Sequence, residues 1–296
     1  MSDAEFLRSE EVSGHTVTPE EDGIPDLQAN TVEERFRRRV TMHVPDRNNP
    51  KLQTLMEWVN SNDELYGLWV AANVTAIERL GMTDHGPVHV KIVTNIALRL
   101  LRLLMDAEIE PAVVAHYGME KDDAEVIVVL AALLHDIGMS IHRTDHEEYS
   151  LFLANDILKS LPEEMFSPQA RAIVRSEILH AIIGHRSGGN PLTLEAGIIR
   201  VADALDMAKG RSRIPFEAGS MSIHSISAAA VERVILEAGE AKPVRISIEI
   251  NNSAGIFQLD QLFREKLRGS GLEAHLEMRA FMEETQEKRL FRQFTL

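Results

Sequence analysis

The segment Val126–Gly138 reads VIVVLAALLHDIG and contains the longest apolar run of the chain, from Val126 to Leu134. Apolar residues on every side of a helix indicate that the helix is buried, so we expect a central buried helix over residues 123–135. It ends on His135 and Asp136. A buried aspartate is costly unless a cation or a hydrogen-bond donor accompanies it. The segment therefore predicts a core helix that ends on a polar pair able to bind metal.

Helical periodicity continues on both sides of this segment, and no alternation of strands and helices is visible. Apolar residues at helical spacing predict further helices over residues 52–60, 64–80, 89–105, 146–161, 168–185 and 192–209. Residues 1–30 are acidic and aperiodic, and we expect a flexible tail there. The fold class is therefore mainly α, with a helical domain over residues 31–213.

The pattern changes in the last third of the chain. Residues 231–236 and 244–250 alternate apolar and polar side chains around a turn that contains Gly and Pro, which predicts a hairpin. A helix over 257–267 and a third strand over 272–281 are expected next. We therefore predict a small α+β domain over residues 214–296.

Composition narrows the possible functions. The chain has 296 residues, with 31 Lys and Arg against 46 Asp and Glu, so its net charge is −15. Such a charge argues against general binding to nucleic acid. The absence of cysteine excludes disulfides and thiolate metal sites, so any metal must be held by His, Asp or Glu. With no signal peptide and no membrane-spanning run, we expect a cytoplasmic protein without membrane contacts.

Histidines gather in the predicted helices. Of the 12 in the chain, eight lie in one stretch: His85, His89, His116, His135, His142, His146, His180 and His185. One buried histidine is usually an ordinary core residue, whereas several that converge with carboxylates form a metal site. His85 and His89 are four residues apart and share a helix face if the helix begins near residue 84.

Two choices arise farther along the chain. His180 and His185 are five residues apart, so both cannot point the same way, and we favour His185 as the ligand. Asp203 has apolar neighbours and is expected to be more buried than Asp206, which could support a ligand.

This order of histidines and aspartates on separate helices resembles the HD phosphohydrolase superfamily. The resemblance covers roughly residues 80–210 and is carried by His89-Val90-Lys91-Ile92-Val93, Leu134-His135-Asp136-Ile137-Gly138, His146, His185 and Val201-Ala202-Asp203-Ala204-Leu205-Asp206. It implies an HD-type helical bundle. The metal ligands that it implies are His89, His135, Asp136 and Asp203 for one ion, and His146 and His185 in addition for a second ion.

The resemblance also implies an activity. It predicts a metal-dependent phosphohydrolase that acts on a phosphomonoester, a phosphodiester or a nucleotide through a metal-activated water. One or two ions of Mn, Fe, Co, Ni or Zn are expected, with Asp136 as the bridge between two. His85 stands where some two-metal members have Glu, which predicts a role as a ligand, as a catalytic residue or in contact with the substrate.

Several basic or polar residues are candidates for binding the substrate. We expect Arg186 to clamp a phosphate, because it follows a predicted ligand. Other candidates, each of which is also plausible as an ordinary surface residue, are Arg143, His180, Lys209, Arg211 and Arg213. Met139 follows Gly138 and the chain has no GYP motif, so cyclic di-GMP is not the expected substrate.

Two other functions fit the same residues. An HD-type diiron oxygenase uses the same ligand set with a pair of irons and O₂. A non-catalytic sensor or scaffold would bind a nucleotide without cleaving it. The expected partner of the phosphohydrolase is a small phosphorylated substrate, with a nucleotide as the leading class, and edge strands of the C-terminal piece could form a homodimer.

Overall fold

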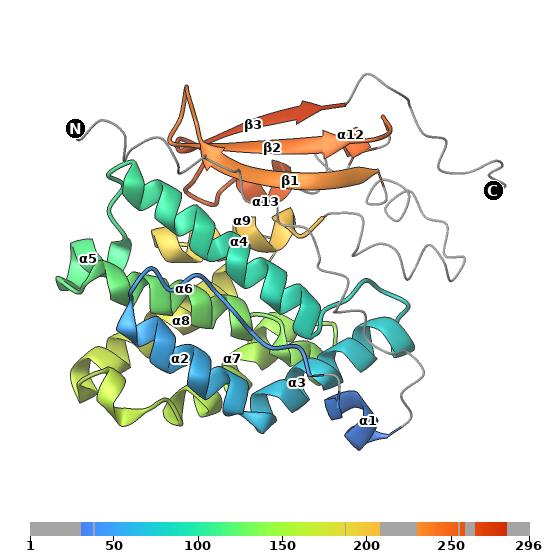
Figure 1. Ribbon diagram of the computed structural model, residues 1–296, viewed down its shortest axis with the longest axis vertical. Helices are drawn as coiled ribbons and strands as arrows, with labels where there is room; N and C mark the ends of the chain where they lie inside the picture. The colour runs from blue at the N-terminus through green and yellow to red at the C-terminus, as the bar shows by residue number, and fades with distance from the viewer. Residues whose placement is uncertain are drawn as a thin grey trace, which may run out of the picture.

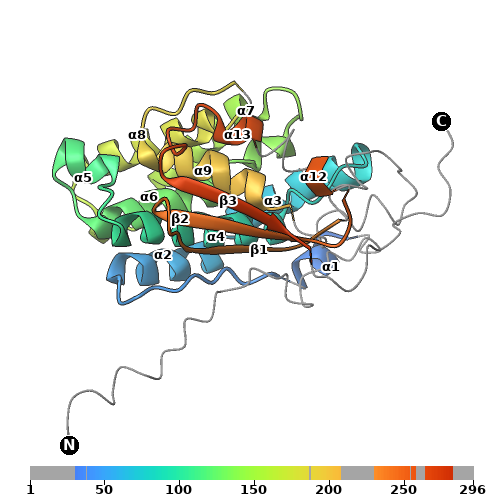
Figure 2. The ribbon, with the colours of Figure 1, turned by 90° about the horizontal axis from the view of Figure 1, so that it is seen from above.

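A helical body carries a small sheet on one side, as Figures 1 and 2 show. The computed structural model describes residues 31–37, 39–186, 188–207, 230–253, 255–257 and 264–282. The helices of the body are α1 (Val32–Arg37), α2 (Pro50–Ser61), α3 (Asp63–Asn73), α4 (Pro87–Asp106), α5 (Ala112–Tyr117), α6 (Lys121–Leu134), α7 (His146–Lys159), α8 (Pro168–Gly184) and α9 (Leu194–Leu205). Shorter turns are the π-helical η2 (Val74–Arg79) and the 3-10 turns η3 (Ile137–Ser140) and η4 (Glu163–Met165).

The described residues of the C-terminal piece form a three-stranded sheet and two short helices. Its elements are β1 (Val231–Ala238), β2 (Val244–Ile250), α12 (Gly255–Phe257), α13 (Arg264–Leu267) and β3 (Leu276–Phe281). The strand β1 pairs antiparallel with β2, and β3 pairs parallel with β2 on its other side. The sheet packs on α4, and α13 packs on α9. This mainly α architecture with a small α+β part confirms the predicted fold class.

The central helix α6 is buried throughout. Every residue from Asp123 to Leu134 is buried, as the apolar run predicts. The α6 carboxylate of Glu125 pairs with both Nε and Nη2 of Arg102 on α4 (2.6 and 3.0 Å) and accepts from Asn49 Nδ2 (3.0 Å). A buried carboxylate is tolerated when its oxygens are all bonded in this way. The pair fixes α4 beside α6, and both helices carry site residues.

Two predicted boundaries are wrong by four residues, whereas the other predicted ends that the structure describes agree within two residues. The helix expected over residues 192–209 ends at Leu205, where the Asp206 carboxylate leaves the helix to bond His89. The strand expected from residue 272 begins at Leu276, because residues 272–276 form a turn in which the Leu272 carbonyl accepts from the N–H groups of His275 and Leu276. The expected tail over 1–30 and the domain boundary at 213/214 lie outside the described residues.

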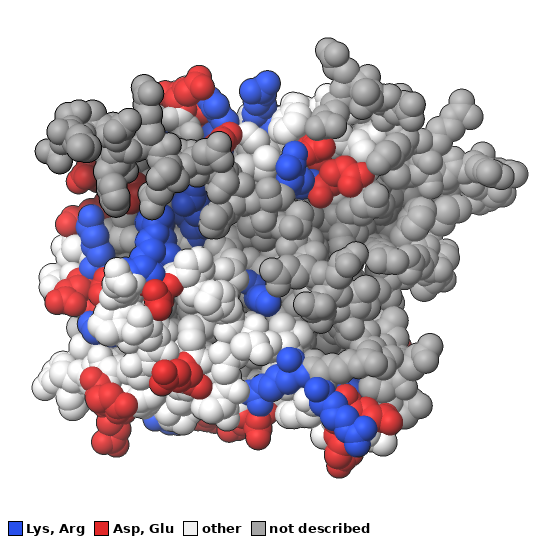
Figure 3. Space-filling model, in the orientation of Figure 1, with Lys and Arg blue, Asp and Glu red and all other residues white. Residues whose placement is uncertain are grey.

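The described surface mixes both signs of charge. Acidic and basic side chains are interspersed over the described part of the face in Figure 3. None of the described helices has the length and apolar character needed to cross a bilayer.

Close packing fixes the turn that follows α6. The Ser150 hydroxyl on α7 accepts from Gly138 N–H (2.8 Å) and donates to the His135 carbonyl (2.7 Å). A Cβ at Gly138 would collide with the His146 carbonyl oxygen and lie 2.9 Å from Ser150 Oγ. Only glycine therefore lets the start of α7 approach the end of α6.

Gly138→Ala should lower the free energy of unfolding by about 3 kcal/mol or more, because backbone rather than a flexible side chain must move. Gly67→Ala is the matched control. The nearest atom to its Cβ would be Phe36 Cζ at 3.7 Å, and alanine is favoured inside α3, so this variant should gain about 0.5–1 kcal/mol. Urea unfolding of both variants measures the difference. A Gly138→Ala protein as stable as wild type would contradict the packing described.

Candidate metal centre

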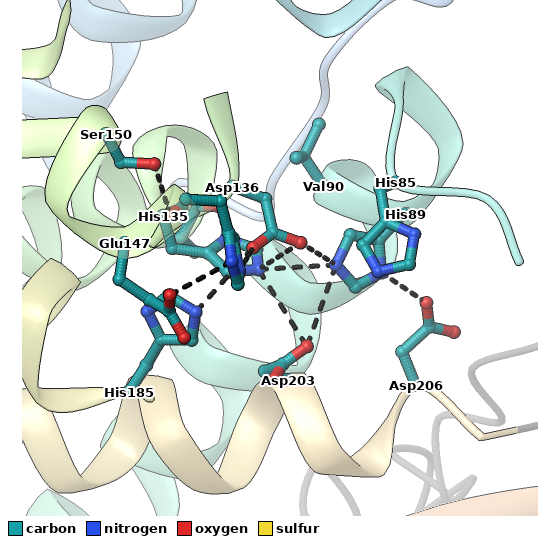
Figure 4. Close-up of polar contacts among 12 residues, drawn as sticks. His85, His89, Val90, His135, Asp136, Glu147, Ser150, His185, Asp203 and Asp206 are labelled. Atoms are coloured by element: carbon teal, nitrogen blue, oxygen red, sulfur yellow. Dashed lines mark hydrogen bonds and ion pairs between the residues drawn. The ribbon is translucent and has the colours of Figure 1, made fainter. Parts of the chain in front are cut away.

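Six side chains from five helix ends converge beside the end of α6, and Figure 4 labels all of them except His146. They lie at helix termini or within one or two turns of them, so that rigid helices position each group. Their order along the chain is His89 in the first turn of α4, His135 and Asp136 directly after α6, His146 as the first residue of α7, His185 directly after α8, and Asp203 in the last turn of α9.

The first group surrounds one oxygen of Asp136. Asp136 Oδ2 lies 3.3 Å from His89 Nε2 and 3.4 Å from His135 Nε2. Asp203 Oδ1 lies 3.7 and 3.8 Å from the same two nitrogens. The ligand atoms of these four residues all lie within 4.8 Å of one another, a spacing that one metal ion can fill.

The second group surrounds the other oxygen of the same carboxylate. Asp136 Oδ1 lies 3.1 Å from His146 Nε2 and 3.6 Å from His185 Nε2. These three residues also bring their ligand atoms within 4.8 Å of one another. Asp136 therefore belongs to both groups and presents one oxygen to each.

The hydrogen bonds of the imidazoles fit a metal site. Nδ1 of His135 donates to the Ala132 carbonyl (2.7 Å), and Nδ1 of His185 donates to the Ile182 carbonyl (2.6 Å). Nδ1 of His89 contacts Asp206 Oδ2 (2.6 Å). An acceptor at Nδ1 places the proton there and leaves Nε2 as the ligand atom. Nitrogen and carboxylate donors in this arrangement suit a divalent transition metal ion.

His146 has a more polar environment than the other ligands. Its Nδ1 lies 2.9 Å from Glu147 Oε2 and 2.9 Å from Arg143 Nη1. Arg143 was predicted as a substrate-binding residue, and it contacts this ligand directly.

A buried network holds the start of α4. Asp84 Oδ1 accepts from the N–H groups of Gly86 and His89 (both 3.1 Å). Asn73, the last residue of α3, donates through Nδ2 to Asp84 Oδ2 (2.8 Å) and accepts from His85 N–H (3.2 Å). A Cβ at Gly86 would lie 2.6 Å from Asn73 Cβ. These contacts fix the start of α4 at Pro87, so His89 lies in its first turn while His85 precedes the helix, and the two do not share a helix face as expected.

The predicted residue His85 lies next to the ligand groups but in neither of them. Its ring centroid is 5.4 Å from that of His89, and its Nδ1 contacts the Thr83 carbonyl (2.7 Å). The side chain is buried. This position beside a ligand is compatible with contact to a bound molecule.

The other predicted residues lie apart or outside the described chain. His180 Nε2 accepts from Leu192 N–H (3.0 Å), away from both groups, whereas His185 belongs to the second group. Arg186 pairs with Glu148 (2.5 Å) at the surface. The three remaining basic candidates, Lys209, Arg211 and Arg213, lie outside the described residues.

One expectation about burial is wrong. The side chain of Asp203 is 17% exposed, whereas that of Asp206 is 3% exposed. The reason is that Asp206 leaves the helix and turns inward to His89, while Asp203 stays on α9 beside the centre. Apolar sequence neighbours do not reveal this turn.

Lys266 was not anticipated from the sequence. Its Nζ lies 3.2 Å from Asp203 Oδ2 and 2.7 Å from the His185 carbonyl oxygen. It belongs to α13 in the C-terminal piece, and no local pattern connects it with the histidines. Glu147 was also missed, although its place directly after His146 is a signal that could have identified it.

Charges within the centre shift the acidities of its members. Burial disfavours the imidazolium form of His135, but the Asp136 carboxylate outweighs burial and raises the pKa of His135 to about 10. Burial acts in the same direction on His146, and Asp136 and Glu147 together raise its pKa to about 9. The surrounding imidazoles lower the pKa of Asp136 well below its usual value in spite of burial. Burial, reinforced by the charges of His135 and Lys266, lowers the pKa of His185.

Comparison with known proteins gives one family. A family model described as HD domain matches residues 88–208, which include every member of both ligand groups. Uncharacterized protein MJ1020 from Methanocaldococcus jannaschii is 41% identical over 225 residues, which cover 76% of this chain and 86% of that protein. No solved structure matches the chain.

The metal-free protein should lose stability as the pH rises above neutrality. The pKa of His146 is about 9 when folded and about 6.5 when unfolded, so its contribution is complete below about pH 6.5 and disappears as the pH passes about 9. Urea unfolding with a chelator at several pH values should show this decrease, and His146→Gln should reduce it. His116→Gln, at an exposed position on α5, is the control and should leave the slope unchanged. Equal slopes in all three proteins would contradict the charge distribution.

Proposed function

Because the chain belongs to the HD domain family of metal-dependent hydrolases, we propose that it is a phosphohydrolase with a binuclear metal centre. The observation that carries the proposal is the Asp136 carboxylate, which presents one oxygen to each of two ligand groups. Two adjacent divalent ions are the usual clamp for the attacking and leaving oxygens of phosphoryl transfer.

Each ligand residue has a distinct part in this proposal. His89, His135 and Asp203 would hold one ion, and His146 and His185 would hold the other. Such ions lower the pKa of water toward neutrality and polarise phosphoryl oxygens. Acceptors at Nδ1 of His89, His135 and His185 place the proton of each neutral ring on Nδ1 and leave Nε2 as the atom that would bind the ion.

We propose that His85 donates a proton to the leaving-group oxygen. It lies beside His89 but outside both ligand groups, and its Nδ1 is oriented by the Thr83 carbonyl. A ring fixed through Nδ1 presents Nε2–H as the donor when the imidazole is protonated. The leaving group of a phosphate ester or a nucleotide needs such a proton to depart as a neutral hydroxyl.

The proposed substrate is a small phosphorylated molecule, with a nucleotide as the leading class. Arg143 contacts the ligand His146, so its guanidinium lies at the edge of the centre where a phosphate oxygen could bind. Arg186 would reach a phosphate only by giving up its contact with Glu148.

Asp136→Ala should lower phosphatase turnover at least about 10³-fold, because the loss of both ligand groups removes several kcal/mol of charge stabilisation. The assay uses phosphomonoester, phosphodiester and nucleotide panels with Mn²⁺, Fe²⁺, Co²⁺ or Ni²⁺, together with bound-metal analysis. The matched control is Asp156→Ala on α7, whose side chain is 74% exposed.

Equal turnover of wild type and Asp136→Ala, together with no bound metal, would refute the proposal. Oxygen consumption by an iron-loaded protein without phosphate release would favour a diiron oxygenase. Tight nucleotide binding without turnover would favour a sensor.

His85→Ala should reduce turnover about 10²–10⁴-fold while the bound-metal content stays at the wild-type level, because the residue is proposed as a proton donor and not as a ligand. Rates for substrates with acidic leaving groups, which need no proton, should fall least. The control is His116→Ala, at an exposed site on α5. A variant that loses metal instead would show that His85 is a ligand.

A further inference from the structure

We propose that Lys266 is a positioning residue of the metal centre, and that Arg200 fastens the segment which delivers it. The inference rests on the proposed metal chemistry of the same site. It gives the C-terminal piece a role in the metal centre, because Lys266 supplies a hydrogen-bond donor to Asp203.

Lys266 fixes the orientation of one proposed ligand. Its Nζ donates to Asp203 Oδ2 (3.2 Å), while Asp203 Oδ1 faces His89 and His135. A carboxylate is planar, so a bond that holds one oxygen determines the direction of the other. Donors of this kind to a metal-binding carboxylate commonly decide how tightly the metal is held.

The same ammonium group also contacts the second ligand group. Lys266 Nζ donates to the backbone carbonyl of His185 (2.7 Å), directly after α8. The ring of His185 is oriented separately, because its Nδ1 donates to the Ile182 carbonyl. One side chain therefore contacts both α8 and α9 at the residues that belong to different ligand groups.

Arg200 lies one turn before Asp203 on α9 and is buried. Within the described part of the chain, its side chain donates to backbone carbonyls on two segments outside α9. Its Nε donates to Lys266 (2.7 Å), Nη1 donates to Arg186 (2.9 Å) and Gly189 (2.6 Å), and Nη2 donates to Glu265 and Arg268 (both 3.3 Å). Five bonds match the five N–H donors of a guanidinium.

The result is a clamp around the lysine. The Arg200 bonds attach two segments to α9, the helix that carries Asp203. One segment contains Lys266, and the other directly follows His185. A second close contact supports this packing, since a Cβ at Gly197 on α9 would collide with the Ser270 carbonyl oxygen. Ordering a lysine side chain costs conformational entropy. A backbone that is already fixed lowers this cost, because only the side-chain torsions remain to be ordered.

The test compares Mn²⁺ binding by metal-free wild type, Lys266→Met and Lys266→Arg. The Met variant keeps the length of the side chain but removes the donor, and we expect its Mn²⁺ affinity to fall about 10–100-fold. The Arg variant keeps a cationic donor and should recover most of that loss. The matched control is Lys242→Met, because Lys242 donates to the Glu273 carbonyl at an exposed site.

Thermal unfolding of the metal-free proteins separates this effect from general damage. We expect the metal-free melting temperatures of the Met and Arg variants to stay close to that of wild type, because the Arg200 clamp uses only backbone carbonyls. If Lys266→Met does not fold, Lys266→Gln replaces it, and its weaker donor should give a smaller loss of affinity.

Turnover at saturating Mn²⁺ adds a second readout, since a positioning defect should be largely restored by excess metal. If Lys266→Met binds Mn²⁺ as tightly as wild type or more tightly, the inference is overturned. That result is expected if the lysine only repels the ion. A wild-type protein that binds no Mn²⁺ overturns the proposed function and the inference with it. If wild type binds Mn²⁺ and turns over substrate, and the Lys266 variants do so equally well, the inference is overturned while the proposed function stands.

Discussion

The Asp136 carboxylate is the constraint on which the rest of the structure depends. It is buried, and a buried anion is stable only where cations or hydrogen-bond donors surround it. Four imidazoles lie within hydrogen-bonding or ion-pairing distance, and they come from four different parts of the chain. The helices must therefore end where they do, since a shift of one turn would remove a partner and leave the charge uncompensated.

The body of the fold was predictable because its signals are local. The apolar run that ends on His135 identifies the buried helix, and alternation identifies the hairpin. The short helix α5 was not predicted, because its first N–H groups are satisfied by the distant Glu195 carboxylate rather than by a local cap. Helix α9 was predicted too long because a distant contact ends it. The bond between Asp206 and His89 joins residues 117 apart in sequence.

The ligand set was predictable to a similar degree, and for a chemical reason. Histidine and aspartate are rare in buried helices, so their presence there is informative. Which of two nearby residues faces the centre was harder to predict, because it depends on where a helix ends. The structure places His185, and not His180, beside Asp136, whereas the relative burial of Asp203 and Asp206 was predicted in the wrong order. Lys266 has no sequence signal, because α13 meets the centre only through tertiary packing.

The parallel pairing of β2 with β3 has a consequence for how the chain folds during synthesis. The helical body is synthesised before α13 and β3. The parallel pairing of β3 with β2 forms late as well, because the chain between the two strands must first close a loop. Arg200 reaches Lys266 across 66 residues, so its guanidinium has no acceptors on α13 until that late segment arrives. A nascent chain can thus bury its apolar core early, yet the metal centre acquires its final geometry only after α13 has been synthesised.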